Sequence, residues 1–370
     1  MRQVKNTVED LALSIGVHPW AFGVRPEGTG HLVLPPGILI DAVVVENMFA
    51  FRNKSGVATK AYTWHSGHGS FTTIPAFVLR IKVRVTPNAA SGIRAVVVVE
   101  HRNLKTLMAK TEAIPGAILV MTSGSAACAT TELLHMLDTA LPNVPFLYIG
   151  DHDFPGFQIY SNIKYGSNDK SYCSHISVCP RLQWVGPSKA DLVASPAGYK
   201  GEKRELHRVH HPHQSETEVT RILDAWEQAH SKRIQAKLSV ADDRDRALVR
   251  GWERKGWLEY EPDVDAAVDD MLAGPSKFRL ADMAVVGVPY LKLFIKQQVQ
   301  IAAPVRVILP IIEAASMRSP VGQRFALLPS QTQTSPVKLA SEANTEESVV
   351  DPMNESSIDA QLAGLLDSVM

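Results

Sequence analysis

The segment PFLYIGDHDFPG (Pro145–Gly156) decides how the rest of this sequence is interpreted. An uninterrupted apolar run is followed at once by an Asp-x-Asp pair, and a Pro-Gly step then leads into a helix-length stretch. Because residues two apart on an extended segment point the same way, Asp151 and Asp153 are predicted to face one site while His152 faces away. The N-terminus of the helix that follows would favour a phosphate group at the same place.

Two more apolar runs precede this one, and together the three runs predict the fold. They are AVVVVE (Ala95–Glu100) and AILVM (Ala117–Met121), and the stretches after them, NLKTLMAKTEA and AACATTELLHMLDTAL, have the length of helices. Buried apolar strands that alternate with helices indicate an α/β fold with a parallel sheet covered on both faces. Ligands of such sheets bind beyond the carboxyl ends of the strands, where Glu100, Ser123–Ser125 and Asp151 fall.

The carboxylates at these strand ends form a set that suits a hard cation. Mg²⁺ binds a few carboxylates and completes its shell with water and substrate phosphate, so Glu100, Asp151 and Asp153 are predicted to hold Mg²⁺ for phosphodiester chemistry. A simpler interpretation stays open at this point. A strand-end aspartate can merely cap the next helix, and Glu100 can be a solvated charge.

Composition limits the other functional classes. The 370 residues carry 38 basic and 38 acidic side chains, and no run approaches the roughly 18 apolar residues of a bilayer span, so no membrane association is expected. A net charge of zero means that nucleic-acid binding must rest on local basic patches. Two such patches occur, and each can equally be a solvated surface. They comprise Arg80, Lys82, Arg84 and Arg94, and the basic and histidine residues of KGEKRELHRVHHPH (200–213).

Four stretches resemble a known family. VVVVE (96–100), AILVMTSG (117–124), FLYIGDHDFPGFQIYSNIKYGS (146–167) and LQWVGPSKADL (182–192) are similar to the Toprim domain, a Rossmann-like parallel-sheet domain, of the family that unites the topoisomerase VI A-subunit with the meiotic Spo-eleven double-strand-break transesterase. The resemblance extends backwards to the latter half of the family's winged-helix domain and forwards to its C-terminal helices. It implies a partial winged-helix, DNA-binding module at 1–78 and a Toprim domain with C-terminal helices at 79–326. Composition adds two expectations outside the resemblance: the polar segment 196–217 is a mobile insertion, and the Ser-, Thr- and Glu-rich residues 327–370 form a disordered tail.

The resemblance also implies a reaction and partners. A tyrosine attacks a phosphodiester of double-stranded DNA and stays linked to the 5′ phosphate, while Mg²⁺ on Glu100, Asp151 and Asp153 steadies the phosphate. DNA contacts are expected from Ser123, Ser125, Lys164, Arg80 and Arg84. A homodimer, a B-type ATPase subunit or meiotic accessory proteins, and a nuclear location are implied in the same way.

Two departures from the family pattern bear on this expectation. The family's tyrosine lies upstream of the segment that matches Val4–Leu11, so no catalytic tyrosine is identified on this chain. The loop after the second strand reads TSGSAACATTE, where the family usually has Gly-Lys-Gly-(Tyr/Phe)-Pro-Asp with a nearby Arg. A noncatalytic DNA-binding or scaffolding relative is therefore the main alternative, and a third class is a tyrosine-free Toprim enzyme such as a primase or a nuclease that uses metal-activated water.

Overall fold

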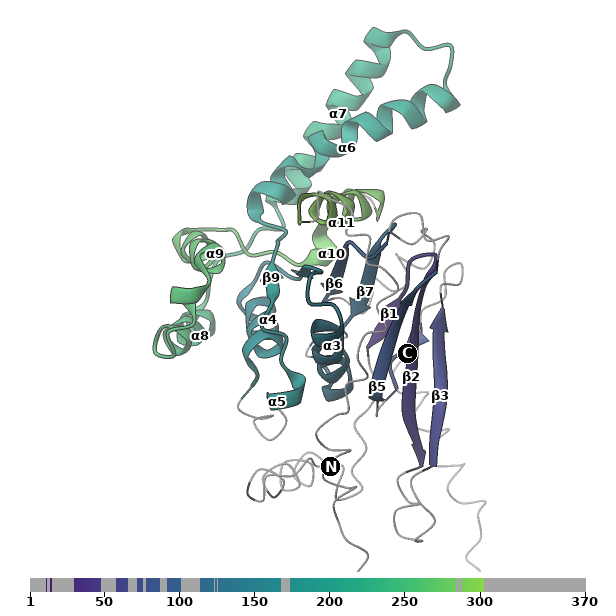
Figure 1. Ribbon diagram of the computed structural model, residues 1–370. Helices are drawn as coiled ribbons and strands as arrows, with labels where there is room; N and C mark the ends of the chain where they lie inside the picture. Colours follow the sequence, from purple (N-terminus) through teal and green to yellow (C-terminus); the bar gives the residue numbers. More distant parts are fainter. Residues whose placement is uncertain are drawn as a thin grey trace, which may run out of the picture. The chain divides into compact units, whose positions relative to one another are not determined.

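A computed structural model describes residues 11, 14, 30–47, 58–65, 72–75, 78–86, 92–100, 114–122, 124, 126–167, 174–283, 286 and 288–302 (Figure 1). These residues fall in one compact unit, Met1–Leu327. The strands are β1 (His31–Val33), β2 (Ile38–Asn47), β3 (Ala58–His65), β4 (Thr72–Thr73), β5 (Val78–Val85), β6 (Ala95–Val99), β7 (Ala117–Met121), β8 (Phe146–Ile149) and β9 (Leu182–Trp184). The helices are α3 (Cys128–Ala140), α4 (Phe154–Tyr165), α5 (Ser174–Ser177), α6 (Lys189–His210), α7 (Glu216–Gln235), α8 (Asp243–Glu253), η4 (Leu258–Tyr260), α9 (Pro262–Ala273), α10 (Leu280–Met283) and α11 (Val288–Ala302).

The main sheet is mostly parallel, as the apolar runs predicted. Its strands lie in the order β4-β1-β7-β6-β8-β9, and β6 pairs in parallel with both β7 and β8. Strand β9 continues the parallel part, whereas β1 pairs antiparallel to β7. The α/β class with a Toprim-like parallel sheet is therefore confirmed.

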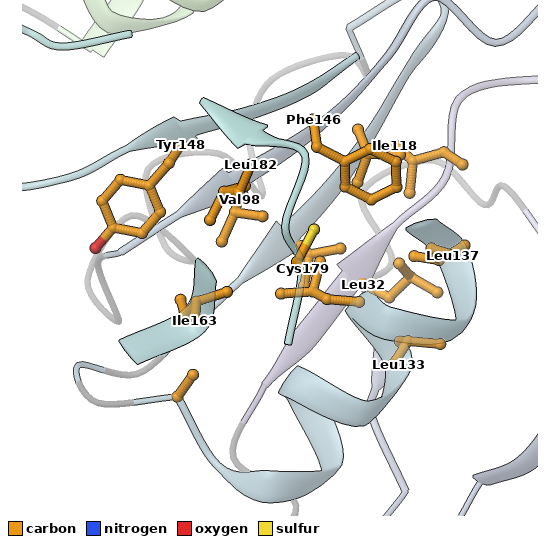
Figure 2. Packing of buried hydrophobic residues seen from close by; sticks show 14 of the residues in the cluster. Leu32, Val98, Ile118, Leu133, Leu137, Phe146, Tyr148, Ile163, Cys179 and Leu182 are labelled. Carbon is orange, nitrogen blue, oxygen red and sulfur yellow. The ribbon is translucent and has the colours of Figure 1, made fainter. Parts of the chain in front are cut away.

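Each central strand serves two hydrophobic cores, because its side chains alternate between the faces of the sheet. Val96 and Val98 of β6 pack in one core with residues of α3 and α4, whereas Ala95, Val97 and Val99 pack in the other with residues of α6, α10 and α11. Figure 2 shows the first core, in which side chains of β6, β7 and β8 meet Leu133 and Leu137 of α3. Burial on both faces explains why these strands read as continuous apolar runs.

A second, antiparallel sheet corrects the predicted domain boundary at residue 78. Strand β2 lies between β3 and β5, so residues on both sides of that boundary belong to one sheet. Strands β1 and β4, also assigned to the N-terminal module, instead extend the main sheet. The boundary was misplaced because pairing between distant strands leaves no local sign in the sequence. The predicted winged-helix residues before Gly30, apart from two single positions, lie outside the described residues.

The polar segment at 196–217 is helical, which corrects its interpretation as a mobile insertion. Residues up to His210 continue helix α6, and α7 begins at Glu216 and packs beside α6 (Figure 1). Ion pairs join the two helices, with Arg204 and Arg208 both reaching Glu216. Tyr199 of α6 and Val219 and Leu223 of α7 are buried, so the two helices have apolar contacts besides these exposed ion pairs.

The helices after the hairpin agree in position with the C-terminal helices expected from the resemblance, and α10 and α11 cover one face of the main sheet. The expected disordered tail at 327–370 lies outside the described residues. No helix in the described part of the chain combines the length and apolar character that a bilayer span requires.

Candidate functional site

Three acidic side chains lie at the carboxyl ends of two adjacent parallel strands. Glu100 directly follows β6, and Asp151 and Asp153 follow β8, its neighbour in the sheet. The backbone itself joins the two strand ends, because Glu100 N donates to Ile149 O at 3.0 Å. The sheet topology therefore brings the predicted carboxylates together at the carboxyl ends of the parallel strands.

Glu100 is a buried carboxylate with two fixed donors. Its side chain is 7% exposed, and Oε2 accepts hydrogen bonds from the Tyr148 hydroxyl at 2.9 Å and from Asp151 N at 3.1 Å. Tyr148 is wholly buried on β8, and its ring packs with those of Tyr160 and Trp184, which also contact each other. Figure 2 shows its hydroxyl pointing away from the labelled aliphatic side chains. A packed aromatic ring thus orients the carboxylate.

The two aspartates are held by backbone donors. Asp151 Oδ1 accepts a hydrogen bond from Leu280 N at 2.6 Å, which ties the loop after β8 to the start of α10. Asp153 is the N-cap of α4, and its Oδ1 accepts from Gly156 N at 2.7 Å. Asp153 therefore has the helix-capping role that the simpler interpretation assigned to it, in addition to its place at the cluster.

His152 lies between the aspartates and is buried, with 2% of its side chain exposed. Its ring stacks on Phe278 and meets Phe157 edge-on, and its carbonyl accepts a hydrogen bond from Phe278 N. Burial lowers the pKa of His152 to about 4, so the ring is neutral at physiological pH. A neutral, packed histidine anchors the loop that carries the carboxylates.

The electrostatics of the cluster suit a bound cation. Burial, followed by the charge of Asp151, raises the pKa of Glu100 to about 8, and burial raises that of Asp153 to about 6. A divalent cation would relieve both penalties, and oxygen ligands are the kind that Mg²⁺ prefers. In the described residues no three His, Cys, Asp or Glu side chains gather closely enough to hold a metal ion without adjustment. All three carboxylates instead accept hydrogen bonds from backbone N–H groups.

A pocket of about 440 Å³ opens beside Asp153. Its wall includes Lys237, Arg244, Lys277 and Arg279 together with carboxylates of α8 and α10. Lys277 and Arg279 lie close enough to offset part of the rise in the pKa of Asp153. Lys277 also forms an ion pair with the buried Asp245. Four cations from residues 237–279 thus lie beside Asp153, together with three further aspartates, Asp242, Asp245 and Asp282.

The predicted DNA contacts have different outcomes. Ser123 and Ser125 lie outside the described residues, so their role stays a prediction. Lys164 points inward, with 14% of its side chain exposed, and it pairs with Glu261 and donates to Tyr160. That assignment is corrected, because a lysine paired in this way is a structural link between α4 and α9. Arg80 and Arg84 are exposed on β5.

The sequence did not indicate several residues that shape the site. Tyr148 stands in an apolar run, where a hydroxyl in an otherwise aliphatic strand is a local sign of a polar partner. Residues 277–280 reach the loop after β8 across more than a hundred positions of sequence, and no spacing rule connects them. They could be found only from the folded chain.

Comparison with known proteins identifies the central part of the chain. Residues 95–245 match the family model for the Toprim domain of the topoisomerase 6 A-subunit/Spo11 family. Meiotic recombination protein rec12 of Schizosaccharomyces pombe is 40% identical over 81 residues, which are 22% of this chain and 23% of that protein. The matched region begins with β6 and contains Glu100, Asp151 and Asp153. Residues 95–245 of this chain are therefore similar to the Toprim domain that the topoisomerase 6 A-subunit shares with Spo11.

Proposed function

We propose that this chain binds double-stranded DNA and takes part in Mg²⁺-dependent double-strand cleavage by transesterification, as in the initiation of meiotic recombination. The observation that carries the proposal is the carboxylate cluster at the ends of β6 and β8, within a domain of this family. The partial similarity to a meiotic recombination protein favours the meiotic form of the activity over a topoisomerase.

In this proposal Glu100, Asp151 and Asp153 hold the ion. Bound Mg²⁺ would supply charge stabilisation to a phosphodiester and to its departing 3′ oxygen. The protein's own part is to keep the carboxylates in position through Tyr148 and through the backbone N–H groups of Leu280 and Gly156. In the pocket beside Asp153, Lys237 and Lys277 pair with Asp282 and Asp245, so Arg244 and Arg279 are the cations that would contact the adjoining phosphates. None of the chain's tyrosines is assigned as the nucleophile.

The first test separates metal binding from cleavage. Titration with Mg²⁺ should raise the melting temperature of the wild-type chain, since a ligand that binds only the folded state stabilises it by about 2.7 kcal/mol at 100 times its Kd. Asp151→Asn and Asp153→Asn should abolish the rise. Asp269→Asn, an exposed carboxylate on α9, is the matched control and should keep it. An equal rise in all four proteins would exclude this metal site.

Cleavage is then assayed by trapping protein–DNA adducts with Mg²⁺. The chain is compared with a version extended upstream to include an in-frame winged-helix tyrosine, each with and without Asp151→Asn. A 5′-linked adduct formed only by the extended, Asp-intact protein is the expected result. The absence of an adduct from every version, despite Mg²⁺ binding, would contradict the transesterase proposal.

A second candidate is a noncatalytic DNA-binding or scaffolding relative that retains the fold. Two observations favour it. The three carboxylates do not form a ready-made metal group among the described residues, and the loop after β7 lacks the Lys and Arg that the family pattern carries. If the chain binds DNA but Mg²⁺ does not raise its melting temperature, the result favours this noncatalytic function.

Partners and location follow from the family and are proposed with the function. We infer a homodimer that works with a B-type ATPase subunit or meiotic accessory proteins in the nucleus. Sedimentation of the full chain with and without DNA would test the dimer, because a protein that remains a monomer on DNA would contradict it.

A further inference from the structure

We propose that the end of helix α6 holds a divalent transition-metal ion such as Zn²⁺, bound by the imidazoles of His207 and His211. These histidines belong to HRVHHPHQS (207–215), the segment that ends α6 and leads to α7. The site shares no residue with the carboxylate cluster at β6 and β8. The inference therefore goes beyond the proposed function and does not depend on it.

The spacing of the two histidines suits a shared ion. Residues four apart lie on one face of a helix, and two histidines at this spacing are a recurrent zinc-binding arrangement. The helical hydrogen bond persists between them, because His211 N donates to His207 O at 2.8 Å. Their ring centroids are 4.6 Å apart, with an angle of 37° between the ring planes. Two imidazoles on one tetrahedral zinc ion have centroids roughly 5 Å apart, so a small movement of the rings admits the ion.

Gln214 orients the first of these rings. His207 Nε2 donates to Gln214 Oε1 at 2.5 Å, and Gln214 N donates to His211 O at 3.2 Å, so the turn folds back on both histidines. Donation from Nε2 leaves the lone pair of His207 on Nδ1. Metal-binding histidines are commonly held in this way, through a hydrogen bond from the ring nitrogen that does not touch the ion.

The charges around the turn permit a cation to bind. The C-terminus of a helix carries a partial negative charge, and His211 is the C-cap of α6. Arg204 and Arg208 of the same helix both pair with Glu216, and Arg208 also pairs with Glu205. Two carboxylates therefore offset the two guanidinium groups. Glu216 also lies in the first turn of α7, where it offsets the positive end of that helix.

The ligand set selects the class of ion. Neutral imidazole nitrogen binds Zn²⁺, Cu²⁺ and Ni²⁺, whereas Mg²⁺ prefers oxygen ligands. His211 is exposed and His207 is half-buried, so an ion reaches the two rings from solvent. Within the described ranges no third His, Cys, Asp or Glu side chain completes a metal-binding group, so water fills the remaining positions. The ion links two residues across the last turn of α6 and holds that end of the helix in place.

The test is calorimetric titration of the full chain with Zn²⁺ in excess Mg²⁺, which competes for carboxylate oxygen but not for imidazole. His207→Ala and His211→Ala should each weaken the binding of one Zn²⁺ equivalent by on the order of a hundredfold, because the second imidazole no longer acts at a high effective concentration. Gln214→Ala should weaken the same equivalent by about tenfold, the usual cost of losing a residue that orients a ligand.

His65→Ala is the matched control, because His65 is an exposed histidine on β3. It should leave the Zn²⁺ equivalent unchanged, and unaltered melting temperatures in EDTA show that every variant is folded. Nuclear magnetic resonance gives a second readout, since Zn²⁺ should shift the ring signals that disappear in His207→Ala and His211→Ala. A Zn²⁺ equivalent that keeps its affinity in both variants, or that weakens equally in His65→Ala, overturns the site. Either result leaves the proposed function untouched.

Discussion

Replacement of Gly150 by alanine should disrupt the base of the carboxylate cluster. Gly150 stands between β8 and Asp151, and an added Cβ would lie 2.4 Å from Tyr148 Cε1 and 2.6 Å from Glu100 Oε2. Neither neighbour can give way easily. Tyr148 is wholly buried against Tyr160 and Trp184, and Glu100 is held by the Tyr148 hydroxyl and by Asp151 N.

The size of the effect follows from two costs. Overpacking of a filled core costs about 1–3 kcal/mol. A shift of the Tyr148 ring also breaks its hydrogen bond to Glu100, and a buried hydrogen bond contributes about 0.5–1.5 kcal/mol. The expected loss of stability is therefore about 2–4 kcal/mol. For a domain of this size that corresponds to a fall of roughly 5–15 °C in melting temperature.

Urea unfolding followed by tryptophan fluorescence measures this loss, and Mg²⁺ titration of the same variant should show weaker stabilisation. Gly201→Ala is the control, because an added Cβ on that residue of α6 meets nothing within 4 Å. It should stabilise the chain by about 0.5–1 kcal/mol, since glycine is unfavourable inside a helix. If Gly150→Ala lowers stability by less than about 0.5 kcal/mol, the packing described around Glu100 is wrong.

Three further predictions concern charged groups. Lys277→Met should destabilise the chain by about 3 kcal/mol in urea unfolding because it leaves the buried Asp245 without its cation, and Asp245→Asn should recover part of that loss. The pKa of Glu100 is raised in the folded state, so the metal-free protein should lose stability as pH rises from about 5 through about 8. Glu100→Gln should flatten that decline in EDTA, and an unchanged decline would assign it to other groups. Arg181→Lys should lower the melting temperature, because Arg181 pairs with Asp138 and donates to four carbonyls, one in the last turn of α3 and three after it. A single ammonium cannot reproduce this fork, and a wild-type melting temperature would contradict the prediction.

The main sheet was predictable because its physics is local. A strand buried on both faces must be apolar at every position, and AVVVV, AILVM and FLYI have no other simple explanation. The position of Glu100 and Asp151 followed from the same runs, since strand ends in a parallel sheet share an edge. These predictions needed no knowledge of which strands were neighbours.

The predictions that failed depended on pairing between distant segments. The boundary at residue 78 was wrong because β5 pairs with β2, more than thirty residues earlier, and half-exposed strands carry only a weak alternating pattern. Lys164 looked available to DNA because its partner, Glu261, lies 97 residues away. The hairpin of α6 and α7 looked mobile because its contacts, such as the ion pair of Arg208 with Glu216, join two helices that are separate in the sequence.

The distribution of charge connects these observations. The loop after β7 carries no lysine or arginine, yet the fold brings four cations from residues 237–279 to the pocket beside Asp153. Four aspartates line the same pocket, and two of them pair with Lys237 and Lys277, which leaves Arg244 and Arg279 to face an incoming phosphate. A phosphate backbone is recognised through positive charge at a suitable distance, whichever segment supplies that charge. Loss of the family's loop residues therefore does not by itself remove the capacity to bind DNA. Arg244 and Arg279 of the pocket and Arg80 of β5, rather than the loop, are the residues whose substitution should decide whether this chain acts on DNA.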